Sequence, residues 1–405
     1  MNKTILPAER LSLTEEYYFS RKLAEVARMR QEGHDVISLA IGSPDLPPPP
    51  AAIDMLCNVA HDPRAHGYQP TKGTPELRAA MARFYRRHFN VTIDSESEVL
   101  PLIGSKEGIL HTTLAFVNPG DTVLVPDPGY PTYTSLSKLL GAQVLHYPLL
   151  PESGYQPDFE FLEHLDTTRV RLLWVNYPHM PTGARPQHST YQRLVAYARE
   201  RGIVIVNDNP YSFILNSGSR MSIMQVEGAR ECCVELNSMS KSHNMPGWRV
   251  GMLVACPKFI QWVLKVKSNI DSGTFRGLQL AAAAAIDADD EWHRQFNVEV
   301  YAARRHYAEA VMRALGCKAD FESQTGMFLW GRIPDDHPLL PSLHLGEADI
   351  RSEKFADRIL QDADVFITPG FIFGRGGNDY VRLSLCAPEE RIAEALERIE
   401  RLQLA

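Results

Sequence analysis

The segment around Lys241 brings together the residue types that covalent amine chemistry needs. An ε-amine attacks an aldehyde only when it is unprotonated, so such a lysine needs surroundings that lower its pKa. Hydroxyl groups and a guanidinium can hold an anionic group, such as a phosphate, beside the amine. The segment supplies them as Ser238, Ser240, Ser242 and, eight positions after the lysine, Arg249. Taken alone, it could equally be a solvated loop rich in serine and lysine.

A second candidate anion site lies in the segment Gly104-Ser105-Lys106. The apolar run at 99–103 predicts a strand before it, and the amphipathic pattern at 105–116 predicts a helix after it. Backbone N–H groups at a helix start attract anions, and the hydroxyl and the ammonium add to that attraction. Small residues are common in turns of this kind, so the segment on its own is weak evidence.

Polar and aromatic residues follow two other predicted strands. Tyr130 comes after the strand predicted at 122–125, and an aromatic face can stack on a planar ring. Asp208 and Tyr211 follow the strand predicted at 203–206. A carboxylate beside a ring nitrogen favours the protonated nitrogen. The residues themselves leave two alternatives open, core packing for Tyr130 and helix capping for Asp208.

In this order, the segments resemble those of the class I and II pyridoxal-phosphate-dependent aminotransferases, which have fold type I. The likeness includes Tyr-Val-Arg-Leu-Ser at 380–384 and Gly-Tyr-Gln-Pro-Thr at 67–71, so it extends over nearly the whole chain. The variants Tyr-Tyr-Phe-Ser, Gly-Ser-Lys-Glu and Ser-Asn-Ile-Asp-Ser-Gly are most similar to one branch of the family. That branch contains LL-diaminopimelate, aspartate and alanine aminotransferases.

The resemblance implies roles for individual residues around the cofactor, pyridoxal 5′-phosphate. Lys241 would form the Schiff base, Asp208 would face the pyridine nitrogen, and Tyr130 would stack on the ring. Tyr211 would donate to the phenolic oxygen, and Arg382 would bind the α-carboxylate of the substrate. The remaining implied contacts are Ser105, Lys106, Ser238, Ser240 and Arg249 at the phosphate, and Gly42 and Tyr17 in the substrate pocket.

One position departs from the family's pattern. The segment 176–183 resembles the family's Asn-Pro-Thr-Gly turn, but Met180 occupies the place of the asparagine. That asparagine donates to the phenolic oxygen of the cofactor, and a thioether cannot donate. Our hypothesis is that Met180 raises the pKa of the imine between lysine and cofactor. Tyr211 remains as a donor, and Asn176 and His179 are further candidates.

Two further segments imply a homodimer with shared active sites. Tyr68 matches the tyrosine that reaches the phosphate of the neighbouring subunit. Asn269 lies in the segment 268–273, which resembles another segment of the family that crosses the interface between subunits. Such an exchange of residues is expected from a closed two-fold dimer. Surface tyrosines and Asn/Gly turns are common, so neither match decides the question alone.

The composition argues against several other classes of protein. The 405-residue chain has a formal net charge of −7 and six scattered cysteines without metal-ligand spacing, so we expect neither a nucleic-acid-binding face nor a metal centre. The N-terminus is polar, without an apolar signal region, and no apolar run is long enough to span a bilayer. A reducing cytoplasm is the expected location.

The order of elements favours an α/β fold. Short β-branched runs alternate with amphipathic helices through the middle of the chain, which predicts a largely parallel sheet covered on both faces. The resemblance implies seven strands in this sheet. It also implies a large cofactor-binding domain, 48–288, and a small α+β domain formed by 1–47 and 289–405. Pro47 to Pro50 is expected to be a stiff extended connector.

The last third of the chain is predicted to alternate strands and helices again. A long helical pattern runs from Glu291 to Leu315 and could bridge the two domains. Strands are predicted at 328–330, 365–368 and 380–385, with helices near 352–361 and from Pro388 onward.

The predicted activity is ping-pong transfer of an amino group between an L-amino acid and a 2-oxo acid. Donors in the diaminopimelate, aspartate, alanine and glutamate range are expected from the branch. The same fold and cofactor also serve β-lyases and cyclopropane-forming synthases, and aminotransferase-like domains also occur as ligand sensors fused to DNA-binding domains. The sensor is disfavoured, because no basic helix precedes Tyr17. Arg375 could meet a distal carboxylate or lie solvated in its loop.

Overall fold

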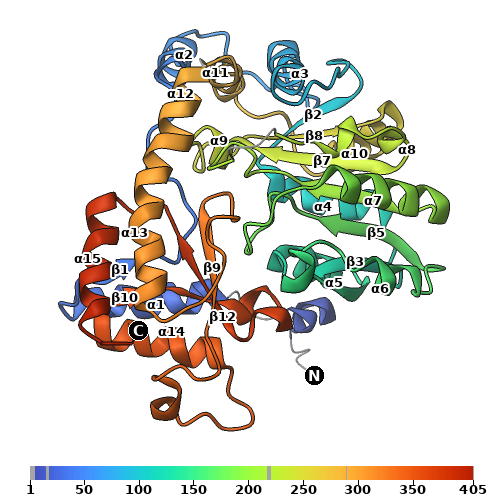
Figure 1. The fold of residues 1–405 in the computed structure, drawn as a ribbon. Coiled ribbons are helices and arrows are strands. Elements are labelled where there is room, and N and C mark those ends of the chain that lie inside the picture. Colours follow the sequence, from blue (N-terminus) through green and yellow to red (C-terminus); the bar gives the residue numbers. More distant parts are fainter. Residues whose placement is uncertain (1–4, 15–17, 217–219, 289, 405) are drawn as a thin grey trace.

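The computed structural model describes residues 5–14, 18–216, 220–288 and 290–404 (Figure 1). Two units lie side by side in it. The larger unit is built around a seven-stranded sheet, and the smaller unit contains two short sheets. The boundaries predicted at 47/48 and 288/289 stay a prediction.

The large sheet consists of seven strands, the number that the resemblance implies. They are β2 (Val99–Leu102), β3 (Thr122–Asp127), β4 (Gln143–Pro148), β5 (Val170–Val175), β6 (Val204–Asp208), β7 (Cys233–Ser238) and β8 (Gly251–Ala255). Their order in space is β2-β8-β7-β6-β5-β3-β4, and only β8 runs against the others. Parallel neighbours need long crossovers, and helices supply them here. The expected mostly parallel α/β sheet is confirmed.

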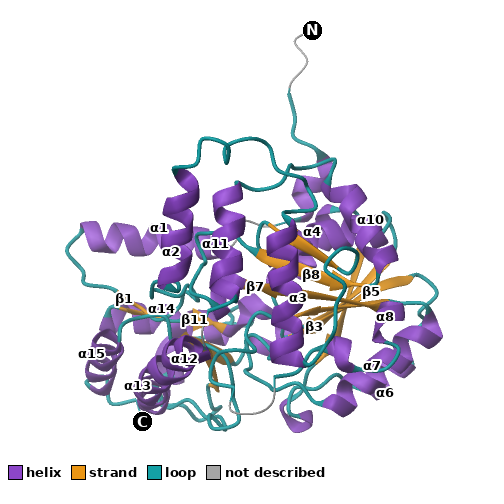
Figure 2. Cartoon of the chain, turned by 90° about the horizontal axis from the view of Figure 1, so that it is seen from above, coloured by secondary structure: helices purple, strands orange, loops and turns teal. Residues whose placement is uncertain are grey.

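Helices cover both faces of this sheet, as Figure 2 shows from above. They are α3 (Pro75–Phe89), α4 (Ser105–Phe116), α5 (Pro131–Leu139), α6 (Phe159–Glu163), α7 (His188–Arg201), α10 (Pro257–Lys267) and α11 (Arg276–Ile286). In β5, Leu172 and Trp174 belong to the core shared with α4 and α10, whereas Leu173 and Val175 belong to the core shared with α3, α7 and α11. Burial on both faces explains the nearly continuous apolar runs of the strands.

The small unit joins residues from opposite ends of the chain. Its sheets are β11-β12-β9, which is antiparallel, and the parallel pair β1-β10. The strands are β1 (Ile37–Ser38), β9 (Phe328–Arg332), β10 (Val365–Phe366), β11 (Thr368–Pro369) and β12 (Tyr380–Ser384). The helices are α1 (Tyr18–Gln31), α13 (Val300–Ala314), α14 (Arg351–Ala363) and α15 (Glu389–Glu400). Arg304 on α13 binds both oxygens of Asp45, at 2.6 and 2.9 Å, which fixes the N-terminal segment to this unit.

The predicted long helix between the units is interrupted. Instead of one helix from Glu291 to Leu315, the chain forms α12 (Asp290–Arg294), a π-helical turn (Gln295–Glu299) and then α13. The carbonyl of Asn297 in that turn accepts a hydrogen bond from the backbone N–H of Leu215 (3.2 Å), so a neighbouring loop shares the helix's hydrogen bonding. The π turn therefore lies where this loop contacts the helix.

Two shorter predictions also need correction. The single strand expected at 365–368 divides into β10 and β11, because β10 pairs with β1 and β11 pairs with β12. Pro50 does not extend the connector but is the first residue of α2 (Pro50–Ala60). Proline suits that position, because the first turn of a helix needs no donor from it. Within the described residues, no helix is long and apolar enough to cross a bilayer.

Candidate active site

A cavity of about 430 Å³ lies at the carboxyl ends of the parallel strands. Parallel strands end at a common edge, so residues that follow β2, β3, β5, β6 and β7 converge there. The predicted residues that line this cavity are Gly42, Ser105, Lys106, Tyr130, Asn176, Met180, Asp208, Tyr211, Ser238, Ser240, Lys241, Arg249 and Arg382.

One corner of the cavity suits an anion. Helix α4 begins there at Ser105, with Gly104 as its N-cap at φ +77°. A Cβ at Gly104 would lie 2.3 Å from Nη2 of Arg249, so glycine leaves the space that the guanidinium occupies. Arg249 Nη1 donates to Ser240 Oγ (3.5 Å). The corner therefore combines a helix N-terminus, hydroxyl groups and a guanidinium.

Lys241 projects from α9 (Met239–Ser242), the short helix after β7. Ser238 caps this helix, because its Oγ accepts the backbone N–H two residues on (3.2 Å). The ammonium of Lys241 donates to the carbonyl of Gly42, in the N-terminal segment. Burial lowers the pKa of Lys241, and the charges of Arg382 and Arg249 lower it further. A lowered pKa favours the neutral amine that can attack carbonyl carbon.

Asp208 ends β6 as a buried carboxylate facing the cavity. Its Oδ2 accepts from the hydroxyl of Tyr133 (2.8 Å), but no donor within the described part of the chain reaches Oδ1. Burial raises the pKa of Asp208 to about 6, although the bond from Tyr133 acts in the opposite direction. A buried carboxylate oxygen without a partner favours a cationic or N–H group in the cavity.

Sequence reasoning missed Tyr133, although it stands one helical turn after Tyr130. The Tyr133 ring stacks on Trp174 with a centroid separation of 4.6 Å, which fixes the direction of its hydroxyl. The type of Tyr133 and its spacing from Tyr130 could have indicated a place near the same site. The sequence predicts the strand β6, but it does not show that β6 ends within reach of the Tyr133 hydroxyl.

Because Met180 occupies the place of the family's asparagine, a sulfur atom lies beside Arg382, the arginine expected to bind the substrate. Arg382 Nη1 donates to Met180 Sδ at 3.4 Å. The amide of Asn176 is engaged with the backbone, since Nδ2 donates to the carbonyl of Asp208 and Oδ1 accepts from the N–H of Met180 (2.8 Å). His179 is not among the residues that line the cavity. The described geometry therefore gives Asn176 a structural use and leaves Tyr211 as the expected phenolic donor.

Arg382 lies on β12, buried between aromatic rings. Its guanidinium carbon is 4.0 Å from the ring centre of Phe328 and 4.8 Å from that of Phe373. Nη2 donates to the carbonyl of Ala40 (2.7 Å). Gly42 lies against the same aromatic ring, because a Cβ there would be 2.4 Å from Cζ of Phe328. Packing and hydrogen bonding thus hold the guanidinium plane toward the cavity.

The remaining wall of the cavity is apolar, and sequence reasoning missed it. It consists of Phe19, Leu23, Ile41, Phe328 and Phe373, with the prolines 210 and 246. Phe19 belongs to the quoted segment Tyr-Tyr-Phe-Ser, but its type does not distinguish a cavity wall from an ordinary core residue.

Several predicted residues lie outside this cavity. Tyr68 is 95% exposed. Asn269 is exposed and donates to the carbonyl of Lys265 (2.8 Å). Arg375 is exposed and does not line the cavity, which favours the solvated loop arginine over a contact with a distal carboxylate. Tyr17 lies outside the described residues.

The sheet topology is that of the fold-type-I aminotransferases. The chain belongs to the family of class I and II aminotransferases, whose model matches residues 34–399. It is therefore an aminotransferase, as the sequence segments predict.

Known proteins resemble the chain over almost its full length. The LL-diaminopimelate aminotransferase of Dehalococcoides mccartyi is 38% identical over 384 residues, covering 95% of each chain. The protein of the same name from Aquifex aeolicus is 36% identical over 402 residues, covering 98% of this chain and 99% of that one. Among solved structures, apo-BacF from Bacillus subtilis is 34% identical with a TM-score of 0.91 and covers 99% of each chain.

Proposed function

We propose that this aminotransferase binds pyridoxal 5′-phosphate in the described cavity, with Lys241 as the residue that holds and releases it. Class I and II aminotransferases depend on this cofactor. The observation that carries the proposal is the position of the Lys241 amine. The same cavity that contains it is lined by Asp208, by the anion corner at Ser105 and by Arg382.

The residues present fit the cofactor. Oδ1 of Asp208 has no donor among the described residues, which suits a protonated ring nitrogen. The corner formed by Ser105 and Arg249 suits a phosphate. Tyr130 lines the cavity where a ring can be stacked. Burial raises the pKa of Tyr211, so its hydroxyl stays protonated and can donate.

Bound pyridoxal phosphate supplies an aldehyde carbon that condenses with amines and a ring that accepts electrons from the substrate's Cα. The chain's own residues do the rest. Arg382 orients the α-carboxylate, and Lys241 removes the Cα proton as a general base and later returns a proton. The rings of Phe328 and Phe373 limit access of water to Arg382. Donor and acceptor occupy the same cavity in turn, so ping-pong kinetics are expected.

The protein functions as a two-fold homodimer in which Tyr68 and Asn269 serve the neighbouring site. Support comes from how their segments lie. The N–H of Gly273 donates to the carbonyl of Gln69 (3.1 Å), so the two predicted interface segments are joined in one surface. Ile270 on that surface is 53% exposed. Exchange of residues across a two-fold axis would complete both sites.

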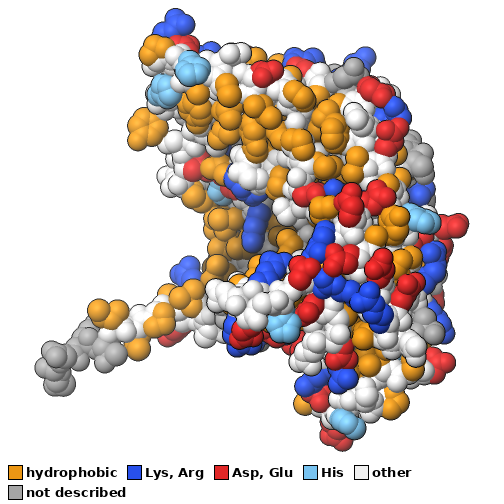
Figure 3. All heavy atoms as spheres, turned by 90° about the vertical axis from the view of Figure 1, so that its left-hand side faces the viewer, with side chains coloured by type: hydrophobic (Ala, Val, Ile, Leu, Met, Phe, Trp, Pro, Cys, Tyr) orange, Lys and Arg blue, Asp and Glu red, His pale blue; other side chains and the backbone are white. Residues whose placement is uncertain are grey.

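An exposed apolar face adds support for the dimer. Ile53 and Met55 on α2 are 41% and 36% exposed. Figure 3 shows hydrophobic side chains gathered over the upper part of this side of the molecule, where α2 lies. A contiguous exposed apolar patch favours an interface between chains. Sedimentation of the holoprotein as a monomer at micromolar concentration would contradict the dimer.

LL-Diaminopimelate is the amino donor that the relatives' names suggest, within the diaminopimelate, aspartate, alanine and glutamate range. The cavity favours a second candidate. Phe19, Leu23 and Phe328 form an apolar wall, which suits an uncharged, bulky side chain. A panel of amino donors, tested with 2-oxoglutarate and pyruvate as acceptors and followed in single half-reactions, distinguishes LL-diaminopimelate from a bulky, uncharged donor. Release of pyruvate and ammonia instead of amino transfer would indicate a β-lyase.

The decisive test of the proposal is chemical fixation of the cofactor. Borohydride treatment of the holoprotein should add the mass of a pyridoxyl group to the peptide that contains Lys241. The Lys241→Ala variant should carry no such mass and should lose activity by about 10⁴-fold. Pyridoxyl mass on another lysine of the wild type, or none, would refute the assignment of Lys241.

A further inference from the structure

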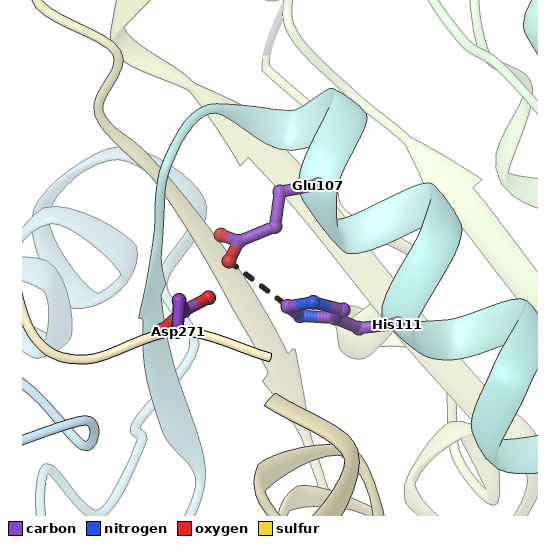
Figure 4. A group of neighbouring side chains, drawn as sticks. All are labelled: Glu107, His111 and Asp271. Atoms are coloured by element: carbon purple, nitrogen blue, oxygen red, sulfur yellow. Dashed lines mark ion pairs between the residues drawn. The ribbon is translucent and has the colours of Figure 1, made fainter. Parts of the chain in front are cut away.

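A buried ionic cluster lies behind the anion corner, and none of its residues has a part in the mechanism above. It consists of Glu107, His111, Asp271 and Lys267. Figure 4 shows the first three, with Glu107 and His111 projecting from α4 and Asp271 from the segment after α10. The side chain of Lys267 is only 3% exposed, and those of Glu107 and Asp271 are 12% and 17% exposed.

The ammonium of Lys267 occupies the place of a cation in this cluster. It donates to Oε1 of Glu107 (2.7 Å) and to both oxygens of Asp271 (2.9 and 2.8 Å). Glu107, His111 and Asp271 have the types and spacing of metal ligands, but the ammonium of Lys267 already contacts both carboxyl groups. Burial and the neighbouring Asp271 raise the pKa of Glu107, whereas Lys267 lowers it. Burial lowers the pKa of His111 to about 4, so its ring is neutral at pH 7. We therefore interpret the cluster as an ionic network and not as a metal site.

Glu107 connects this network to the anion corner. Its second carboxylate oxygen, Oε2, accepts from the backbone N–H of Ile103. Its own backbone N–H donates to the carbonyl of Gly104 (3.2 Å). Glu107 thus closes the turn from which α4 begins, and Ser105 and Lys106 line the cavity from that turn. A tilt of the Glu107 side chain would move the backbone groups that the proposed phosphate would contact.

Asp271 connects the network to the segments of the proposed dimer interface. Its backbone N–H donates to the carbonyl of Lys267 (3.0 Å), and the segment continues to Gly273, which pairs with Gln69. Asn269 lies between Lys267 and Asp271 in the same loop. One lysine therefore touches both the turn behind one site and the loop that would serve the partner's site.

We propose that Lys267 is a positioning residue that holds the phosphate-binding turn of α4 through Glu107 and links it to the interface loop through Asp271. The inference rests on the proposed function, because a phosphate is assigned to that turn only by the cofactor. Without the ammonium, Glu107 would lose the contact that holds its carboxyl group and that opposes the rise of its pKa on burial. The turn would then lose both its fixed geometry and its favourable electrostatics.

The test compares two cofactor forms that differ only in the phosphate. Apoprotein of the wild type and of Lys267→Met is titrated with pyridoxal 5′-phosphate and with pyridoxal, and the Kd values are read from the absorbance of the bound ring. The variant should bind pyridoxal phosphate about tenfold or more weakly, with little change for pyridoxal. Lys265→Met is the matched control, because it removes an exposed lysine from the same helix. It should bind both forms as the wild type does.

The outcomes separate this inference from the proposed function. Equal losses of both cofactor forms, or no loss, would overturn the positioning role of Lys267. A wild-type apoprotein that binds neither form would instead overturn the proposed function. If Lys267→Met does not fold, Glu107→Gln replaces it, because this variant weakens the same contact without leaving an unpaired charge. It should show the same selective loss for the phosphorylated form, and its absence would overturn the inference as well.

Discussion

The two halves of the cavity are built differently. The half proposed for the cofactor consists of polar groups on short turns at the ends of β2, β6 and β7. The half proposed for the substrate consists of Arg382 held between aromatic rings of the small unit, with the backbone of Gly42 beside it. In the first half, hydrogen bonds set the geometry. In the second, packing between aromatic rings sets the geometry together with the hydrogen bond from Arg382 to Ala40.

This difference explains where specificity can vary. Polar turns at strand ends have little freedom, because each side chain must satisfy a buried partner. An apolar wall has no such constraint, since residues of similar volume can replace one another at small cost. We therefore expect the cofactor half to tolerate almost no substitution without loss of activity, and the wall at Phe19 and Leu23 to determine the donor.

The strongest test of the comparison is Asp208→Asn, which removes the charge from the cofactor half. The value of kcat should fall by about 10²–10³-fold, because the ring nitrogen loses its counter-charge. Apoprotein stability should change in the opposite direction. Burial raises the pKa of Asp208 from 3.8 to about 6, so the wild-type apoprotein loses stability as pH rises through about 6.

The variant lacks this titration. Its apoprotein should therefore be more stable than the wild type at pH 8, by about 1–3 kcal/mol, and the difference should shrink as the pH falls from about 6 toward 3.8. Thermal unfolding of both apoproteins at pH 4.5 and pH 8 measures this difference. A difference that stays constant with pH would contradict the raised pKa.

The Arg382→Leu variant changes only the substrate half of the cavity. Loss of the only guanidinium proposed for the α-carboxylate should lower kcat/KM by about 100-fold. The Kd for pyridoxal phosphate should stay close to the wild-type value, because the anion corner is separate. Arg382→Lys should be intermediate, since an ammonium cannot form two parallel hydrogen bonds. A large loss of cofactor affinity in Arg382→Leu would show that the two halves are not independent.

Tyr133→Phe probes the support behind the cofactor half. The hydroxyl donates to Asp208, and this bond lowers the pKa of the carboxyl against the effect of burial. Removal should raise that pKa and reduce kcat by about tenfold. A pH profile of kcat shifted upward on its acidic side would support this reading. Tyr155→Phe serves as a control for loss of a phenol outside the cavity.

The smallest effect is expected from Met180→Asn. Met180 lies where the two halves meet and contacts Arg382 through its sulfur atom. An asparagine can donate to the phenolic oxygen of the cofactor, so the absorbance midpoint of the bound cofactor should move down by about one pH unit or less. Unchanged midpoints in wild type and variant would refute the hypothesis that the thioether raises this pKa.

The sequence predicted the cofactor half better than the substrate half. The segments at Gly104-Ser105 and before Lys241 are each weak evidence alone, but their order along the chain resembles that of a known family. The strands could be predicted because apolar residues occupy consecutive positions in each of them. Phe328 and Phe373 could not be assigned, because nothing in a phenylalanine indicates that an arginine from another strand lies between them.

Two other features depended on contacts between distant parts of the chain. The π turn at Gln295–Glu299 arises where Leu215 contacts the helix, and no periodicity of the helix itself shows this. The division of the strand at 365–368 depends on β1, which lies at the other end of the chain. Helix and strand patterns are local, whereas these two features are not.

The pairing of β1 with β10 has a consequence for how the polypeptide is made. On the ribosome, β4 to β8 each emerge after a strand with which they pair, whereas β2 pairs only with β8 and must wait for it. Residues 18–45 emerge before these strands, but their partners α13 and β10 follow only after the large sheet. Residues 18–45 therefore lack their final partners while the large sheet is being made, and chaperones can bind them during that time.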